Sequence, residues 1–257
     1  MSAIFSSIFT PLSAFFTAII MAFTNLFGAW FGFIEEPVNP EDPDVGTPAI
    51  VYETNDPAEV AAFYVEASDK TRDDNMAPVG YQTMLLDGEI TCDGAAGTIL
   101  NVLNPVISSA LARNTRETDY IPGAARGDLL ASDITECHLV VYEDGSAYIY
   151  ANLKEQVDGS DCDGHEAGPV ARGIGTLGSI DTALEELGAE ITSGRDTISL
   201  TYRDAYIQCE IDADGYIVSG TWHYYVDILV LDIKAKISII SANIQNLRGT
   251  VEYTVVI

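Results

Sequence analysis

Acidic side chains gather between residues 156 and 179, the longest stretch of the chain without a clear helix or strand pattern. Carboxylate oxygens are the ligands that Ca²⁺ prefers in proteins. The stretch therefore suggests a calcium site, and a solvated acidic loop without an ion is the alternative interpretation. The candidate ligands are Asp158, Asp161, Asp163 and Glu166.

The spacing in this loop departs from that of a known calcium loop. Asp161, Asp163 and Gly164 form an Asp-x-Asp-Gly pattern, and calcium loops carry an obligatory glycine at their sixth position. If Gly164 takes that position, Gly159 and Val170 fall at the first and last ligand positions. Neither residue has a carboxylate, so the pattern favours the solvated loop.

Catalytic motifs are not found in the chain. His165 lies in the acidic loop, whereas His138 and His223 lie in predicted strands, where packing or pairing is the simpler role. The glycine-rich run between residues 173 and 178 precedes a predicted helix, but no parallel strand with a crossover surrounds it, as dinucleotide binding requires. The motifs G-x-S-x-G, H-E-x-x-H and the P-loop do not occur. The sequence does not predict an enzyme.

The four cysteines are Cys92, Cys137, Cys162 and Cys209. They are widely spaced and form no C-x-x-C pair, which argues against a zinc knuckle or a thioredoxin-like motif. Outside the cytoplasm, an even number of cysteines permits two disulfides with three possible pairings. The alternative is that some are buried free thiols, because Cys137 and Cys209 lie in alternating, strand-like segments.

The composition is strongly acidic. The chain has 257 residues with 39 acidic and 12 basic side chains, which makes a formal net charge of -27. Phosphate contacts need a basic face, so nucleic acid is not expected as a partner. Such acidity is typical of halophile surfaces and of extracellular bacterial proteins.

Residues 1–34 carry no charged side chain and predict a hydrophobic helix. Pro11 breaks or kinks it, which leaves residues 12–34, long enough to span a membrane with some tilt. An uncleaved anchor is the first prediction because no basic start and no A-x-A cleavage site are present. An atypical cleaved signal and an interfacial helix are the alternatives. Residues 35–54 are acidic and rich in proline, and they predict a semi-rigid linker.

Residues 55–257 predict a single α+β domain. Asp56 and Pro57 are typical of a helix start, and further helices are expected over residues 94–114 and 180–187. Alternating strands are expected at 81–91, 134–142, 147–155, 198–202, 205–211, 216–230, 233–244 and 247–257. Short turns at Asp144-Gly145 and Asp214-Gly215 join consecutive strands. We therefore expect a curved antiparallel β-meander packed on two or three helices, preceded by the N-terminal hydrophobic helix.

Four segments, at residues 55–64, 80–91, 164–187 and 219–233, carry a resemblance to a known group of proteins. They resemble an uncharacterised secreted or surface domain of Gram-positive gut bacteria, and the similarity covers nearly all of residues 55–257. It implies an extracytoplasmic location and no particular activity. The location expected is therefore a membrane-anchored domain outside the cell, or a secreted one.

The long C-terminal strands with helices upstream are also similar in texture to tubular lipid-binding domains. This resemblance implies a lipid or other hydrophobic ligand between the sheet and the helix at 94–114. The residues expected to line the pocket are Leu103, Ile107, Trp222, Tyr224 and Val226. The alternative is that these side chains only fill a core, in a structural or adhesive surface protein whose acidic face meets partners or cations.

Overall fold

The computed structural model describes residues 48–94, 97, 104–105, 108, 115–123, 127–160, 168–177, 189–237 and 240–257. The described helices are α2 (Pro57–Asp73) and α4 (Pro169–Gly173), with 3-10 turns η2 (Ala131–Asp133) and η3 (Arg195–Thr197). The strands are β1 (Ile50–Thr54), β2 (Gly80–Thr91), β3 (Arg116–Thr118), β4 (Ile134–Tyr142), β5 (Ala147–Leu153), β6 (Gln156–Asp158), β7 (Ala189–Ser193), β8 (Ile198–Ile211), β9 (Ile217–Ile237) and β10 (Ile240–Val256).

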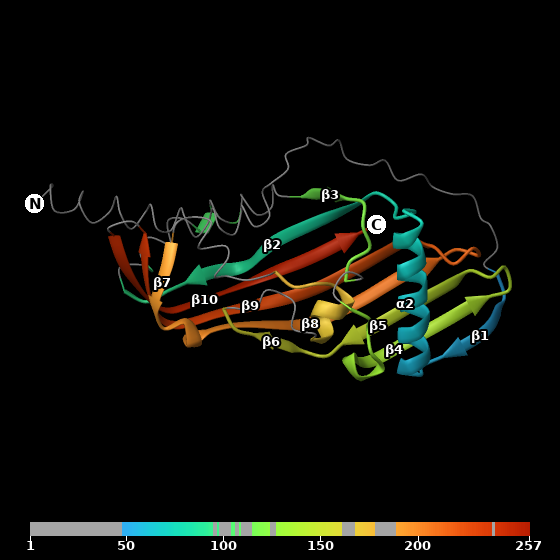
Figure 1. Cartoon of the computed structure of the whole chain (residues 1–257), viewed down its shortest axis with the longest axis horizontal. Coiled ribbons are helices and arrows are strands. Elements are labelled where there is room, and N and C mark those ends of the chain that lie inside the picture. The colour runs from blue at the N-terminus through green and yellow to red at the C-terminus, as the bar shows by residue number, and fades with distance from the viewer. Residues whose placement is uncertain are drawn as a thin grey trace, which may run out of the picture.

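These strands form one antiparallel sheet in the order β1-β4-β5-β8-β9-β10-β2-β3 (Figure 1). β6 also pairs with β8, where it continues the line of β5, and β7 pairs with the end of β9 beyond β8. The central strands follow one another as a meander, whereas β1 and β2 join opposite sides of it. The predicted antiparallel sheet is confirmed, and the described part of the molecule is more sheet-dominated than the α+β prediction implied.

Local turn chemistry explains the hairpins. Gly145 has φ +88° between β4 and β5, and Gly215 has φ +88° between β8 and β9, a conformation that glycine adopts without steric cost. Asp144 accepts a hydrogen bond from the backbone of Ser146 (2.9 Å). Asp212 likewise accepts from the backbone N–H groups of residues 214 (3.0 Å) and 216 (2.9 Å). Both predicted turns are confirmed.

Helix α2 begins as the sequence predicts. The Asp56 side chain accepts a hydrogen bond from the backbone of Ala58 (2.9 Å), and Pro57 takes the first helical position. The buried side of α2, with Val60 and Tyr64, packs across β4, β5 and β9. We call this side of the sheet the helix face and the opposite side the far face. Side chains of a strand alternate between the two.

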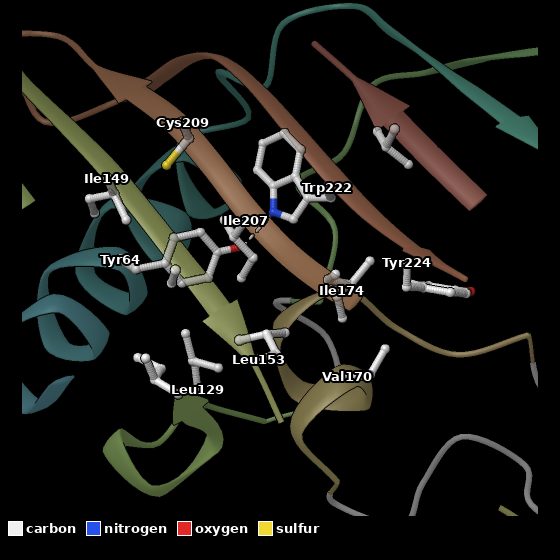
Figure 2. Close-up of a cluster of buried hydrophobic side chains, with 14 of the residues drawn as sticks. Tyr64, Leu129, Ile149, Leu153, Val170, Ile174, Ile207, Cys209, Trp222 and Tyr224 are labelled. Carbon is white, nitrogen blue, oxygen red and sulfur yellow. Dashed lines mark hydrogen bonds between the residues drawn. The ribbon is translucent and has the colours of Figure 1, made fainter. Parts of the chain in front are cut away.

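Tyr64 joins the helices to the sheet (Figure 2). Its hydroxyl accepts a hydrogen bond from the indole Nε1 of Trp222 (2.8 Å) and donates toward the carbonyl oxygens of Pro122 (3.3 Å) and Gly173 (3.4 Å). Both side chains are buried. Gly173 ends α4 in close packing, because an added Cβ would lie 2.6 Å from Leu153 Cδ1 and would force that side chain to shift. One hydroxyl therefore ties together α2, β9, the 115–123 segment and α4.

Several predicted boundaries are wrong. β9 is one strand of 21 residues, where the prediction ended one strand at residue 230 and began another at 233. β10 likewise continues through residues 245 and 246, where its register with β9 is unchanged and Asn246 takes a left-handed backbone conformation at φ 51°. Residues 50–54, predicted as linker, pair with β4 as an edge strand. Local pattern cannot reveal that pairing, because these residues leave their side chains mostly exposed.

Other predicted elements lie outside the described residues. They are the N-terminal helix over 1–34, most of the linker and the helix over 180–187. The helix predicted over 94–114 is described only at residues 94, 97, 104–105 and 108, and each of these is helical. Within the described ranges, no helix combines the length and apolar character that crossing a membrane requires.

The first prediction concerns Tyr64→Phe. The change leaves the buried Trp222 N–H without its acceptor, so we expect the free energy of unfolding to fall by about 2 kcal/mol. Urea denaturation measures this change, and the slope of the unfolding free energy against urea concentration should be the same for the variant and the wild type. Tyr216→Phe is the matched control, because its hydroxyl donates to Asp74 at the exposed surface and its loss should change stability little. Equal stability of the Tyr64 variant and the wild type would contradict the assigned role.

Candidate functional site

Backbone irregularities in three neighbouring strands lie side by side. In β4, Ile134 pairs with Leu153 and Glu136 with Asn152, which leaves Thr135 as an extra residue. β5 ends at Leu153, and β6 resumes the same line only at Gln156. Strand β8 contains a bulge in the adjacent position. Bulges re-aim side chains and interrupt pairing, so their alignment opens the sheet locally.

The bulge in β8 contains Asp204 and Ala205. Arg203 pairs with Tyr225 and Tyr206 with His223, so two residues of β8 stand opposite one residue of β9. Asp204 has φ 52°, a left-handed conformation that is uncommon outside glycine and tolerated best by Asp and Asn. Backbone strain of this kind persists where the surroundings impose it, and it often occurs at functional sites.

The aligned irregularities form a groove of about 520 Å³ on the far face. Cavities of about 300–1,000 Å³ hold small ligands in proteins. Most lining side chains are polar or aromatic. The lining residues are Thr135, Asn152, Leu153, Glu155, Arg203, Asp204, Ala205, Tyr206 and His223.

A row of four rings runs along and beside the groove. Tyr150 and Tyr206 have centroids 6.2 Å apart at 31°, and Tyr206 and His223 are 5.1 Å apart at 32°. His223 meets Tyr225 edge to face at 5.0 Å. We call Tyr150, Tyr206, His223 and Tyr225 the aromatic row. It places flat apolar surfaces from β5, β8 and β9 next to the polar lining.

Arg203 is held by two carboxylates. Its Nε donates to Asp227 (2.7 Å), its Nη1 donates to Asp204 (2.6 Å), and the guanidinium lies 4.9 Å above the Tyr225 ring. These hydrogen bonds raise the pKa of Arg203 and lower the pKa of Asp227, which also accepts from Thr250 (2.7 Å). The charge of Arg203 is therefore balanced within the protein, and its orientation is set before any ligand arrives.

Asn152 is positioned in the same way. Its Oδ1 accepts from the Tyr150 hydroxyl (2.8 Å), and its Nδ2 donates to Glu136 (3.3 Å). Thr135 donates to the Asn152 carbonyl oxygen (3.2 Å). The groove thus contains a fixed amide, a fixed guanidinium and the carboxylates of Glu155 and Asp204.

His223 lies buried in the floor of the groove. Its Nδ1 is 3.0 Å from Thr254 Oγ1 and 3.8 Å from Glu252 Oε1. Burial lowers the pKa of His223, although Glu252 and Asp204 act in the opposite direction. The ring is therefore neutral at neutral pH. Within the described part of the chain, Nε2 has no hydrogen-bond partner, so it can serve a ligand.

The residues that the sequence predicts to line a pocket do not lie in this groove. Trp222, Tyr224 and Val226 share one side of β9, as the alternation predicts, but all three are fully buried on the helix face. Trp222 is bonded to Tyr64, and Tyr224 stacks on Tyr253 with centroids 4.7 Å apart. Leu103 and Ile107 lie outside the described residues. A pocket shared by all five residues stays a prediction.

The predicted calcium ligands are only partly described, because Asp161, Asp163 and Glu166 lie outside the described ranges. Asp158 is buried, and both of its carboxylate oxygens accept from Gln156 Nε2 at 3.0 Å. Gln156 Oε1 in turn accepts from the Ala171 backbone of α4 (2.9 Å). Asp158 therefore helps to anchor α4. The described residues contain no cluster of three or more metal-ligating side chains.

Three of the four cysteines are described, and none of these forms a disulfide. Cys137 and Cys209 are buried free thiols in the sheet, and Cys92 is a half-buried free thiol. Burial raises the pKa of Cys209 to about 12, which makes it unreactive. Cys162 lies outside the described ranges. Cys137 and Cys209 thus fit the alternative of buried free thiols, because the strand pairing places both in the core as packing residues.

The groove was not among the predicted sites, yet the sequence contains one signal for it. Apolar residues alternate up to Tyr202 and resume at Ala205, three residues later instead of two. This change of phase is typical of a bulge within one strand. Nothing local indicates that β4 and β5 are irregular at the same level.

Comparisons with known proteins add no family to this description. No protein family model matches the chain, and neither a curated protein nor a solved structure matches it. The resemblances to secreted or surface domains of Gram-positive bacteria and to tubular lipid-binding domains therefore stay predictions. The geometry of the groove is the basis for assigning a function.

The second prediction concerns the pH dependence of stability. The unfolded chain binds a proton at His223 near pH 6.5, whereas the folded chain does so only at lower pH. The contribution of a neutral His223 is therefore fully present above pH 6.5 and is lost as the pH falls below it. We expect wild-type protein to lose more stability than His223→Gln on acidification, measured by urea denaturation. An NMR titration midpoint of His223 at or above 6.5 would contradict this.

Proposed function

We propose that the chain is an extracytoplasmic binding domain that recognises its ligand in the far-face groove. In this proposal residues 12–34 tether the domain to a membrane, or the protein is secreted. The observation that carries it is the alignment of the irregular segments of β4, β5 and β8, which places polar side chains and aromatic rings around one cavity. The net charge of -27 supports an extracellular surface and argues against nucleic acid as the ligand.

Pre-organisation supports binding as the role of the groove. Arg203 is fixed by Asp204 and Asp227, and Asn152 is fixed by Tyr150 and Glu136. Side chains already held in place lose little conformational freedom when a ligand binds. The groove is also accessible at its lining, since Asp204 and Glu155 are exposed and Tyr206 is half-buried.

A hydrophobic ligand is the second candidate. The buried aromatic side chains Tyr202, Tyr224 and Tyr253 pack together on the helix face, on the same side as the helix α2. A lipid between this face and the 94–114 segment would meet an apolar surface. A structural or adhesive surface protein with an acidic, cation-binding face is the remaining alternative.

The third prediction tests the groove. Full-length protein is immobilised and exposed to extracellular bacterial material separated into polysaccharide, protein and lipid fractions. We expect one fraction to bind, and we expect Tyr206→Ala to weaken that binding by about tenfold or more, since truncating a central aromatic contact costs over 1 kcal/mol. The measurement is biolayer interferometry.

The matched control for this experiment is Tyr148→Ala. Tyr148 lies on the far face of β5, is half-buried like Tyr206 and does not line the groove. The Tyr148→Ala variant should bind the same fraction as strongly as the wild type does. If no fraction binds, or if both variants lose binding equally, the groove is not the recognition site.

The fourth prediction concerns the lipid candidate. If a lipid is held against the helix face, native mass spectrometry of the purified full chain should show an added lipid mass that is removed by organic extraction. Val226→Trp, which adds volume at a fully buried position of that face, should reduce the lipid-bound fraction. Protein that carries no lipid, together with an unchanged melting temperature when lipid is supplied, would rule the lipid candidate out.

A further inference from the structure

The groove has the chemistry of a site for neutral sugars. A sugar ring presents hydroxyl groups, which both donate and accept hydrogen bonds, around two faces of C–H groups that are apolar. A site for it needs planar side chains with paired donors or acceptors at its edges and an aromatic ring against its face. The groove and the aromatic row provide both.

The edge of the groove carries the paired polar groups. Asp204 and Glu155 have carboxylates that can each accept from two neighbouring hydroxyls, and His223 presents its Nε2 from the floor of the groove. Of the two carboxylates bonded to Arg203, Asp204 is the more exposed, with 67% of its side-chain surface exposed against 41% for Asp227. Its left-handed backbone aims the carboxylate away from the core, where the neighbouring Ala205 is buried instead.

The aromatic row supplies the apolar surface. Tyr150 and Tyr206 are half-buried, and their ring centroids lie 6.2 Å apart with the planes inclined at 31°, so the two rings form a short aromatic strip across β5 and β8. Neighbouring strands lie about 4.8 Å apart, a spacing comparable to the width of one sugar ring. A strip that crosses strands suits a short oligosaccharide that lies across the sheet.

The charges of the groove argue against anionic small ligands. Arg203 is already paired with two carboxylates, and Glu155 adds a further negative charge, so phosphate or carboxylate ligands are repelled. The lining is too polar to hold a lipid chain, because the exposed carboxylates of Asp204 and Glu155 would lose their hydrogen bonds to water. A neutral, hydroxyl-rich ligand is the class that matches the lining.

We infer that the groove at the β8 bulge binds a neutral oligosaccharide, with Tyr206 against one sugar ring and Asp204, Glu155 and His223 on its hydroxyls. This inference rests on the proposed function, since it names the ligand class of the same groove. The carboxylate of Asp204 is a ligand contact in this arrangement, and Arg203 acts as a positioning residue that holds it.

The fifth prediction is tested with full-length protein on an array of neutral hexose and N-acetylhexosamine oligosaccharides, uronic acid oligosaccharides, and phosphatidylglycerol vesicles. Calorimetry then measures the affinity for the best binder. We expect neutral oligosaccharides to bind and uronic acid oligosaccharides to bind at least about tenfold more weakly, which is 1.4 kcal/mol. Tyr206→Ala should weaken neutral binding by about tenfold or more.

Asp204→Asn is the second variant, because Asn tolerates the left-handed backbone and keeps the fold while it removes the charge. This variant should bind neutral oligosaccharides with an affinity several fold lower than the wild type. The difference in affinity between neutral and uronic acid oligosaccharides should also become smaller. Tyr148→Ala should bind like the wild type. Melting curves of all the variants show whether a loss of binding reflects unfolding. If Tyr206→Ala is unstable, the affinity of Asp204→Asn for neutral oligosaccharides tests the inference instead.

The possible failures can be told apart. If no saccharide binds but a protein or lipid fraction binds in a manner that Tyr206→Ala weakens, the sugar inference is overturned and the groove remains a binding site. If a deacetylated, cationic oligosaccharide binds more tightly than its neutral counterpart and the gain disappears in high salt, the site is one for cations and the inference also falls. If nothing binds in a groove-dependent manner, both the inference and the proposed function fall.

Discussion

The hydrogen bond between the Trp222 indole and the Tyr64 hydroxyl is the contact on which the arrangement of helix and sheet depends. Both groups are buried, and a buried polar group without a partner costs about 1–3 kcal/mol. The same hydroxyl reaches the carbonyl oxygens of Pro122 and Gly173, so α2 and α4 dock at one point. On the opposite side of β5, β8 and β9, polar and aromatic side chains line the groove.

The two faces of the sheet follow from the period of two along each strand. Trp222, Tyr224 and Val226 pack beneath α2 and its neighbours, and His223 and Tyr225 alternate with them on the other side. A bulge changes this phase locally without ending the strand. The bulge at Asp204 keeps Ala205 buried in the core and turns the carboxylate of Asp204 outward. The same backbone irregularity therefore preserves the core packing and supplies a polar group to the groove.

The predictions from sequence succeeded where the interacting residues lie close together in the chain and failed to name partners that lie far apart. The N-cap at Asp56 and the turns at Gly145 and Gly215 are confirmed, because each depends on residues within a few positions of one another. The shared face of Trp222, Tyr224 and Val226 was also foreseen from alternation, whereas their hydrogen-bonding and stacking partners come from distant segments. The free thiols of Cys137 and Cys209 show the same limit, since sequence spacing left their pairing open.

The sequence by itself determined the antiparallel strands, their turns and the start of α2, because these follow from local steric preference, capping and the alternation of apolar side chains. It also contained the phase change between Tyr202 and Ala205 that marks the bulge. Only the tertiary structure decided the strand order, the recruitment of β1 to the edge of β4 and the alignment of three irregularities into a groove. Each of these depends on contacts between residues far apart in the chain, and their free energy appears only when the strands pair.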